Sequence, residues 1–169
     1  MMVIEKASLK DVPALADFFL GHIEAHPEYI SHGELQMGVG EGVIRDGVLN
    51  AFPAPDARVK WLRYIRHQVL ARTYARVWKA VDDGEIVGFC VADIESDGDA
   101  PFGVICDILV KPDYRGHGAG SSLLNTALEW LRSKKVKGIY LESGKNNHAA
   151  HRFFEKRGFA HLSEIYKLG

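Results

Sequence analysis

The sequence predicts a mixed α/β (α+β) fold built on one mixed β-sheet. Segments rich in β-forming residues alternate with segments whose apolar residues recur at helical spacing. The strand–turn–helix–strand order from 103 to 142 is a βαβ unit, which joins two roughly parallel strands. A length of 169 residues favours a single domain over 1–169.

The N-terminal part of the chain contains a strand and a helix before its pattern stops. Residues 2–7 favour a strand. Ser8 and Asp11 are residues that start helices, and an apolar stripe follows them as far as Ile23. From 27 to 57 glycine is frequent and no period is sustained. We expect a long loop there, and such loops in compact domains are usually functional.

Regular periodicity returns after residue 57. The expected segments are a helix around 59–69, a hairpin at 74–81 and 85–92 with a turn at Asp82-Asp83-Gly84, a strand at 103–110, a helix around 123–131, a strand at 138–142, a helix at 147–156 that Gly158 ends, and a final strand at 159–168. The 103–110 segment is almost continuously apolar, which is typical of a central strand buried on both faces.

The composition argues against several classes of protein. A net charge of -1 and a pI of 6.7 disfavour a nucleic-acid-binding protein. No apolar run approaches the ~18 residues of a membrane span, and residues 1–6 lack the build of a signal peptide. Cys90 and Cys106 lie in apolar strand segments, so we expect reduced, buried thiols and a cytoplasmic protein.

The turn after the central strand carries the clearest functional signal. Gly116, Gly118 and Gly120 alternate between the end of a buried strand and the start of a helix. Glycine lets the backbone approach a ligand, and the first turn of a helix attracts anions, so the pattern suits a pyrophosphate. A Walker A loop would need a Lys after Gly120, and a dinucleotide-binding loop would need another glycine spacing. A turn without a ligand is the remaining alternative.

Three segments between 103 and 159 carry the pattern of one known superfamily. They are 105–114 (ICDILVKPDY), 115–120 (RGHGAG) and 147–159 (NHAAHRFFEKRGF). They resemble the fourth strand, the Arg/Gln-x-x-Gly-x-Gly/Ala loop and the Asn…Ala…Phe-Tyr…Gly-Phe segment of the GNAT superfamily of N-acetyltransferases. The resemblance implies a GNAT-like domain whose parallel fourth and fifth strands splay apart, with helices on both faces of the sheet.

The resemblance also implies a reaction: direct transfer of the acetyl group of acetyl-CoA to a primary amine of a small molecule or peptide, without a metal. The CoA-binding residues carried over by position are Ile108, Leu109, Val110, Arg115, Gly116, His117, Gly118, Ala119, Gly120, Ser121, Asn147, Ala150, Phe153 and Phe154. We expect the variable 27–57 segment to select the acceptor. The charge of the acceptor stays open. A basic helix face at 58–67 would attract an anionic acceptor, whereas an acidic segment at 93–99 would attract a cationic one.

Two departures from the family pattern bear on catalysis. Phe154 stands where many members have a Tyr that protonates the CoA thiolate, and Cys106 stands where some have a Glu base. The remaining candidates are Asp107 or Glu142 as a base through water, and Tyr140, Ser143 or His148 as an acid. The alternative for Asp107 is a structural role, and for His148 a solvated position on its helix.

Other interpretations of the sequence also stay open. The missing Tyr and Glu motivate one alternative, a CoA-binding sensor or interaction module with weak or lost catalysis, and transfer of a longer acyl group is another. Only eleven residues follow Gly158, where family members commonly form a hairpin, so one long strand or a partner chain in a homodimer would complete the sheet. His22 and His26 are one helical turn apart, but we expect them to line an acceptor pocket or face solvent rather than bind a metal.

Overall fold

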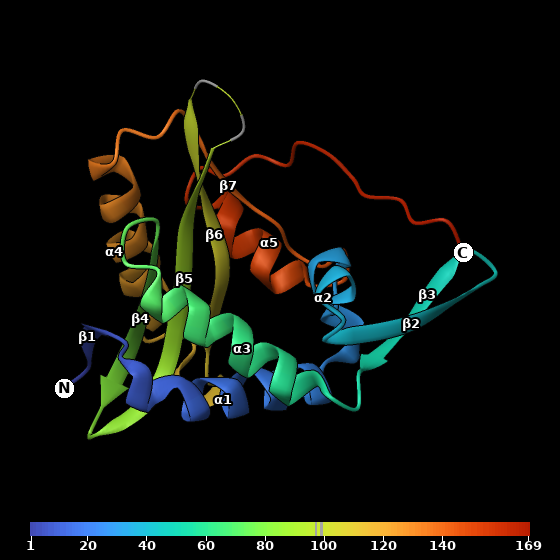
Figure 1. The fold of residues 1–169 in the computed structure, drawn as a ribbon, viewed down its shortest axis with the longest axis horizontal. Helices are drawn as coiled ribbons and strands as arrows, with labels where there is room; N and C mark the ends of the chain where they lie inside the picture. Colours follow the sequence, from blue (N-terminus) through green and yellow to red (C-terminus); the bar gives the residue numbers. More distant parts are fainter. Residues whose placement is uncertain (97, 99) are drawn as a thin grey trace. The chain divides into compact units, whose positions relative to one another are not determined.

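The computed structural model describes residues 1–96, 98 and 100–169, and these residues form two compact units. The first unit comprises Met1–Ala16 and Leu62–Glu142, and the second comprises Asp17–Trp61 and Ser143–Gly169. Helices α1 (Val12–Ala25) and α3 (Ala57–Leu70) each contribute residues to both units. Figure 1 labels the helices and strands in chain order.

The first unit is built on a mixed sheet. Within the described residues, its five strands lie in the order β1-β4-β5-β6-β7. Their bounds are Val3–Lys6 (β1), Ala75–Asp82 (β4), Glu85–Ser96 (β5), Pro101–Val110 (β6) and Ile139–Leu141 (β7). Neighbouring strands are antiparallel from β1 to β6, whereas β6 and β7 are parallel. The mixed sheet and its parallel last pair confirm the predicted fold class.

The hairpin of β4 and β5 forms the centre of this sheet. Asp83 and Gly84 turn the chain with φ of 49° and 78°, the left-handed pair that matches the twist of a two-residue hairpin. The side chains that the hairpin buries include Val77, Ala80, Val87, Phe89 and Val91. The predicted hairpin and its turn are therefore confirmed. Asp97 and Asp99 of the acidic 93–99 segment lie outside the described residues.

Helix α4 (Ala119–Ser133) follows the glycine turn and packs along the sheet, beside β4 and β5 in Figure 1. Its buried face consists of Ala119, Leu123, Leu124, Ala127, Leu128 and Leu131, which confirms the predicted stripe. A Cβ on Gly88 would lie 3.1 Å from Leu123 Cδ1, and one on Gly103 would lie 2.8 Å from Leu131 Cδ2. Glycine on β5 and β6 thus lets the helix approach the sheet closely.

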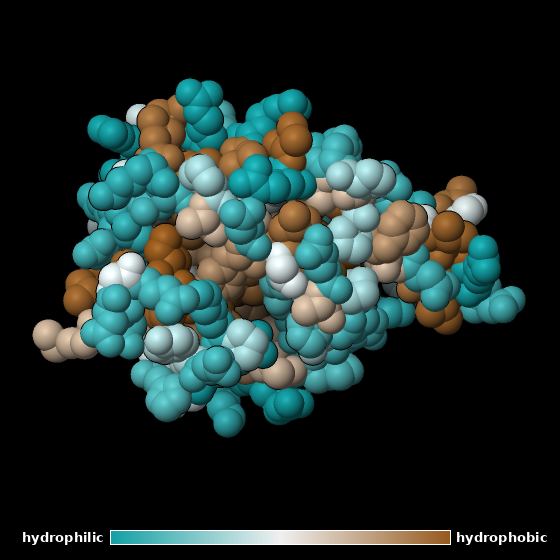
Figure 2. Space-filling view, turned by 90° about the horizontal axis from the view of Figure 1, so that it is seen from below, coloured by the Kyte–Doolittle hydropathy of each residue, from teal (hydrophilic) through white to brown (hydrophobic). Residues whose placement is uncertain are grey.

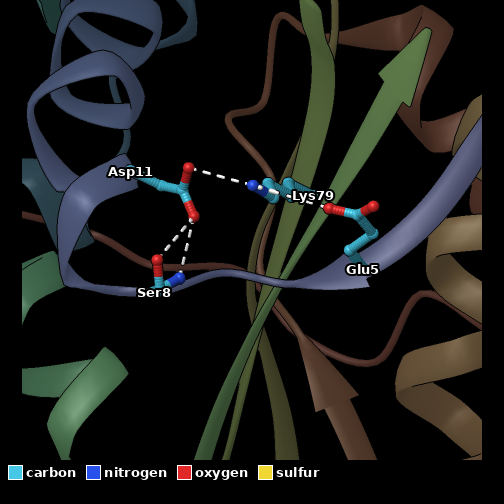
Figure 3. Close-up of polar contacts among 4 residues, drawn as sticks. All are labelled: Glu5, Ser8, Asp11 and Lys79. Carbon is cyan, nitrogen blue, oxygen red and sulfur yellow. Dashed lines mark hydrogen bonds and ion pairs between the residues drawn. The ribbon is translucent and has the colours of Figure 1, made fainter. Parts of the chain in front are cut away.

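A buried ion pair fixes the chain between β1 and α1 (Figure 3). Lys79 on β4 is 8% exposed, and its Nζ lies 2.9 Å from Asp11 Oδ1 and 3.6 Å from Glu5 Oε2. The other oxygen of Asp11 accepts from the backbone N–H of Ser8 at 2.8 Å and from its hydroxyl at 3.2 Å. Ser8 and Asp11 thus cap the short 3₁₀ turn Leu9–Asp11 that leads into α1.

The second unit contains regular structure where we expected a loop. Its short elements are a 3₁₀ turn at Pro27–Tyr29, α2 (His32–Met37), β2 (Gly40–Arg45), β3 (Val48–Pro53) and α5 (His148–Glu155). The side chains of Ser31 and Glu34 form a capping box that starts α2. Asp46 and Gly47 turn the β2–β3 hairpin with φ of 52° and 75°. Segment 27–57 is therefore a helix and a hairpin rather than a long loop.

The predicted final strand at 159–168 is wrong, because the structure shows no strand there. Leu162, Ile165 and Tyr166 are 74%, 62% and 88% exposed. Their apolar side chains bury too little surface to hold a strand in place. The prediction used β-forming residues alone, which do not make a strand unless another strand pairs with them.

The face of the molecule shown in Figure 2 is mainly polar. On the face shown in Figure 2, hydrophilic side chains predominate and hydrophobic side chains are scattered among them. The exposed apolar side chains of the β2–β3 hairpin include Val43, Val48 and Phe52. Among the described residues, no helix is both long and apolar enough to cross a membrane.

Candidate functional site

The parallel strands β6 and β7 separate halfway along β6. They pair through Gly103 with Ile139, Val104 with Tyr140 and Ile105 with Leu141, and the pairing stops there. β6 continues to Val110 along its other neighbour, β5. Among the described residues, 106–110 therefore have a strand partner on one edge only. The expected separation of the parallel pair is confirmed.

The open edge of β6 presents backbone donors. The N–H of Lys111 donates to Val87 O on β5 at 2.8 Å. Because successive N–H groups of a strand point to opposite edges, those of Val110 and Ile108 point away from β5. This edge has the hydrogen-bonding groups that an added extended segment would pair with.

A β-bulge lies where the two strands separate. Val91 on β5 pairs with Asp107, but the next residue, Ala92, pairs with Ile105, so Cys106 is the extra residue. Burial, and then the nearby carboxylate of Asp93, raise the pKa of the Cys106 thiol far above its usual range. The thiol therefore stays protonated at neutral pH. Both Cys90 and Cys106 are free cysteines.

Two donors on α3 hold two carboxylates beside this bulge. The Tyr64 hydroxyl donates to Asp107 Oδ2 at 2.8 Å, and Gln68 Nε2 donates to Asp93 Oδ2 at 3.1 Å. Burial, and then the charge of Asp107, raise the pKa of Tyr64 well above its usual value, so its hydroxyl keeps its proton. Asp93 Oδ1 is buried and accepts no hydrogen bond from the described residues.

The glycine turn has an unusual backbone and open space around it. Gly116 and Gly118 adopt φ of 79° and 86°, where other residues are strained. A Cβ on either glycine would meet nothing within 4 Å. Gly118 is the N-cap of α4, whose first N–H groups have no intrahelical acceptor and carry the positive end of the helix dipole. Positive φ, open space and a helix start together suit a phosphate group.

Two polar side chains lie on the same loop. Arg115 and His117 are exposed, and Arg115 Nε donates to Val110 O at 3.3 Å. This bond links the loop to the last residue of β6. Ala119 is buried as the first residue of α4, and Gly120 and Ser121 are part-buried in its first turn. The structure thus places 108–110 and 115–121 consecutively, at the end of β6 and the start of α4.

Tyr140 lies on the same face of the sheet as Asp93. Asp93 pairs with Val104, and Val104 pairs with Tyr140, so the three side chains lie level on neighbouring strands. Tyr140 is 48% exposed, and its ring meets that of Phe102 edge-on at 5.8 Å. The structure therefore brings Tyr140 to the face on which Tyr64 and Gln68 hold Asp107 and Asp93.

Glu142 is exposed directly after β7. Burial, and then the charges of Asp93 and Glu142, raise the pKa of Glu95. Negative charge therefore accumulates at this end of the sheet.

The other predicted residues lie in the second unit, on α5 and just before it. Asn147 is the N-cap of α5, and its Oδ1 accepts from the N–H of Ala150 at 3.3 Å. Phe154 is buried, with ring centroids 5.3 Å from Phe153 and 5.8 Å from Phe159. The predicted helix at 147–156 is confirmed. Ser143 is part-buried, and His148 is exposed with its ring 5.7 Å from that of His151.

His22 and His26 belong to an aromatic cluster in the second unit. The ring of Tyr29 stacks on His26 at 4.7 Å and lies 5.9 Å from His22. His26 Nδ1 is 2.9 Å from Glu28 Oε1. His22 and His26 thus both make ring contacts, and His26 also contacts a carboxylate.

Tyr64 and Gln68 are the site residues that the sequence did not reveal. The predicted helix stripe around 59–69 included Val59, which is 56% exposed. Tyr64 and Gln68 are four residues apart and flank the buried Ile65, so they share the buried face of α3. A polar pair on an otherwise apolar face is the signal that could have identified them.

Curated relatives share part of this sequence. A Bacillus subtilis (strain 168) protein, named provisionally as a ribosomal protein bS18 alanine N-acetyltransferase, is 34% identical over 92 residues, or 54% of this chain and 58% of that protein. The N-alpha-acetyltransferase 30 of Schizosaccharomyces pombe (strain 972) is 27% identical over 107 residues, or 62% of this chain and 68% of that protein. The chain spans about half the length of the first two curated relatives that it matches, 58% and 46%.

Solved structures and a family model also match this chain. A Clostridium acetobutylicum protein described as a predicted acetyltransferase, solved with acetyl-CoA, has a TM-score of 0.68 at 18% identity and covers 100% of this chain and 96% of its own. That similarity shows a shared fold. The model of the acetyltransferase (GNAT) family matches residues 45–159, which is more than half of the sequence. The chain therefore belongs to the GNAT family of acetyltransferases.

Proposed function

We propose that this protein transfers the acetyl group of acetyl-CoA directly to a primary amine of a small molecule or peptide. The observation that carries the proposal is the open edge of β6, which leads straight into the glycine turn at the start of α4. An extended arm and a pyrophosphate, joined as they are in CoA, match these two features in the same order along the chain.

CoA would bind mainly through backbone groups. Its pantetheine arm would add to β6 at Ile108–Val110, where the N–H groups of Ile108 and Val110 point away from β5. Its pyrophosphate would meet the N–H groups of 115–121, with Arg115 and His117 supplying side chains at the rim. On the family resemblance alone, we add Asn147, Ala150, Phe153 and Phe154 as further contacts.

The transfer needs proton movement and orientation from the chain. An ammonium acceptor gives one proton, through water, to Asp107, and the neutral nitrogen forms a bond to the thioester carbon. The carbon–sulfur bond breaks with its electron pair on sulfur, the new amide nitrogen loses a second proton, and the thiolate gains one. The N–H of Val110 would stabilise negative charge on the carbonyl oxygen. Holding the reactants together supplies much of the remaining rate.

The proton for the leaving thiolate has several candidate sources. Phe154 has none to give, so we infer that Tyr140, Ser143 or His148 supplies it, with Glu142 as a second base candidate. Tyr140 is favoured among them because it shares a face of the sheet with the carboxylates at the bulge. General acids and bases of this kind contribute about 10²–10⁴-fold in rate.

The names of the relatives suggest which amines to test first. One curated relative is named provisionally for N-acetylation of an alanine of a ribosomal protein, and another is named as an N-alpha-acetyltransferase. A structural neighbour with a TM-score of 0.64 at 16% identity is an aminoglycoside acetyltransferase. We propose a protein or peptide α-amine as the first acceptor class, with segment 27–57 selecting it.

The test measures acetyl-CoA binding and thiol release with three acceptors: a peptide with a free α-amine, a lysine peptide with a blocked N-terminus, and an aminoglycoside. Gly118→Ala is expected to weaken acetyl-CoA binding by at least about tenfold, because its Cβ would occupy the space proposed for the pyrophosphate. Gly84→Ala is the matched control, with φ of 78° and no atom within 4 Å of its Cβ. Equal binding by both variants contradicts the site, and binding without thiol release would indicate a module that lacks catalysis.

A further inference from the structure

Tyr64 makes a contact that the proposed reaction does not yet use. It reaches from α3 to β6, and its hydroxyl donates to Asp107 Oδ2 at 2.8 Å across 43 residues of sequence. Asp107 is the first residue after the bulge, at the point where β6 continues without β7. The hydrogen bond therefore fixes a carboxylate beside the edge to which the acetyl donor is proposed to bind.

We propose that Tyr64 is a positioning residue for acetyl transfer: it orients the Asp107 carboxylate and keeps it ionised so that it accepts the proton of the acceptor amine. This inference rests on the proposed function and assigns the base of that same site. Tyr64 itself neither gains nor loses a proton in the reaction. Its hydroxyl stays protonated because burial, and then the charge of Asp107, raise the pKa of Tyr64.

The surroundings explain why Asp107 needs such a partner. The titratable groups around it include the Tyr64 hydroxyl from α3, the Asp93 carboxylate and Cys90 thiol from β5, and the Cys106 thiol from its own strand. Asp93 is a like charge, which disfavours ionisation of Asp107. A hydrogen bond to the charged form opposes that effect and limits the rotation of the carboxylate.

Gln68 supports the same arrangement from the next turn of α3. It donates to Asp93 Oδ2 at 3.1 Å and is 4% exposed. The second carboxylate is thereby held apart from the first, by a separate donor on the same helix face. The two helix donors thus keep one carboxylate each, and only Asp107 lies on the strand with the open edge.

The proton balance of the step is simple. The acceptor ammonium loses one proton to Asp107 through water, and the resulting amine forms the carbon–nitrogen bond as the carbon–sulfur bond breaks. The amide nitrogen then loses a second proton, and the CoA thiolate takes up one. One proton is released to solvent per turnover, and Asp107 returns to its ionised form when it loses its own.

The test is the pH profile of kcat/KM for Tyr64→Phe, with the acceptor that the wild type uses best. All variants are measured with one acceptor, so its own ionisation affects them equally. We expect the acidic limb to move up by about one pH unit and kcat/KM at neutral pH to fall about tenfold. Acetyl-CoA affinity should not change, because phenylalanine keeps the ring that packs at this position.

Two further variants make the result decisive. Tyr74→Phe is the matched control, because Tyr74 also bonds to α3, at His67 Nε2 and 2.7 Å, and its loss should leave the profile unchanged. Asp107→Asn should abolish the acidic limb, and the double variant Tyr64→Phe/Asp107→Asn should be no slower than Asp107→Asn alone.

Different failures are distinguishable. If Tyr64→Phe lowers the rate by one factor at every pH, or leaves the limb in place, its positioning role is refuted while the proposed function stands. If Asp107→Asn keeps the wild-type pH profile of kcat/KM, Asp107 is not the base, and the proposed role of Tyr64 is refuted as well. If the wild type binds acetyl-CoA but acetylates no amine, the proposed function itself fails.

Discussion

Single residues decide how the start of the chain is fixed. Burial raises the pKa of Asp11, but the Ser8 N–H and the Lys79 ammonium outweigh it and hold the pKa below its usual value of 3.8. A carboxyl group with a depressed pKa stabilises the fold above the unfolded-state value, and this contribution is lost as the pH falls below 3.8. The ion pair of Figure 3 is therefore a source of acid sensitivity.

Asp11→Asn should lower the free energy of unfolding by about 3 kcal/mol at pH 7, because it leaves the buried Lys79 ammonium without its nearest counter-charge. The deficit should shrink as the pH falls below 3.8, where the wild-type carboxyl also becomes neutral. Asp17→Asn, which breaks an exposed pair with Arg58, should cost less than about 1 kcal/mol. Urea unfolding across pH measures both, and equal losses at pH 7 would refute a structural role for the buried pair.

At the scale of elements, the turn before α5 depends on one close approach. A Cβ on Gly144 would lie 2.5 Å from the carbonyl oxygen of Tyr29. This oxygen belongs to the backbone, so it cannot easily move away. Asn146 Nδ2 donates to Glu28 O at 3.2 Å, and His151 Nε2 lies 2.9 Å from Gly144 O. These contacts join 27–29 to the segment that leads into α5.

Gly144→Ala should therefore destabilise the second unit by about 1–3 kcal/mol. Gly33→Ala is the control, because Gly33 lies within α2, where the nearest atom to its Cβ would be 3.9 Å away. That change should be neutral or slightly stabilising, since alanine favours helix. Thermal unfolding compares the two variants, and no loss of stability in Gly144→Ala would show that this approach is not tight in solution.

Local patterns predicted the elements whose signals are complete within a few residues. The turn at Asp83-Gly84, the buried stripe of α4 and the helix α5 are of this kind. Asp46-Gly47 carries the same hairpin signal, but frequent glycine obscured the short strands around it. The predicted strand at 159–168 was wrong for the opposite reason: strand-forming residues are present there, but their side chains are exposed.

In the whole molecule, the residues of the candidate donor site could be predicted from the sequence, but only some of those of the candidate catalytic site could. The main residues of the donor site lie in one continuous segment, β6 and the glycine turn, so they are close in space because they are close in sequence. Tyr64 and Asp107 are 43 residues apart and meet only through packing of α3 on the sheet. No local pattern encodes that contact.

The proposed function depends on the acetyl donor binding as an added strand at the open edge of β6. Amide hydrogen exchange at single residues, measured by NMR with and without saturating acetyl-CoA, shows whether it does. The N–H groups of Ile108 and Val110 should exchange at least about tenfold more slowly with the donor bound, since they would gain acceptors. Lys111, which already donates to Val87 O, should change little. If the N–H groups of Ile108 and Val110 exchange at their free rates when the protein is saturated with acetyl-CoA, the donor does not add to β6 as a strand.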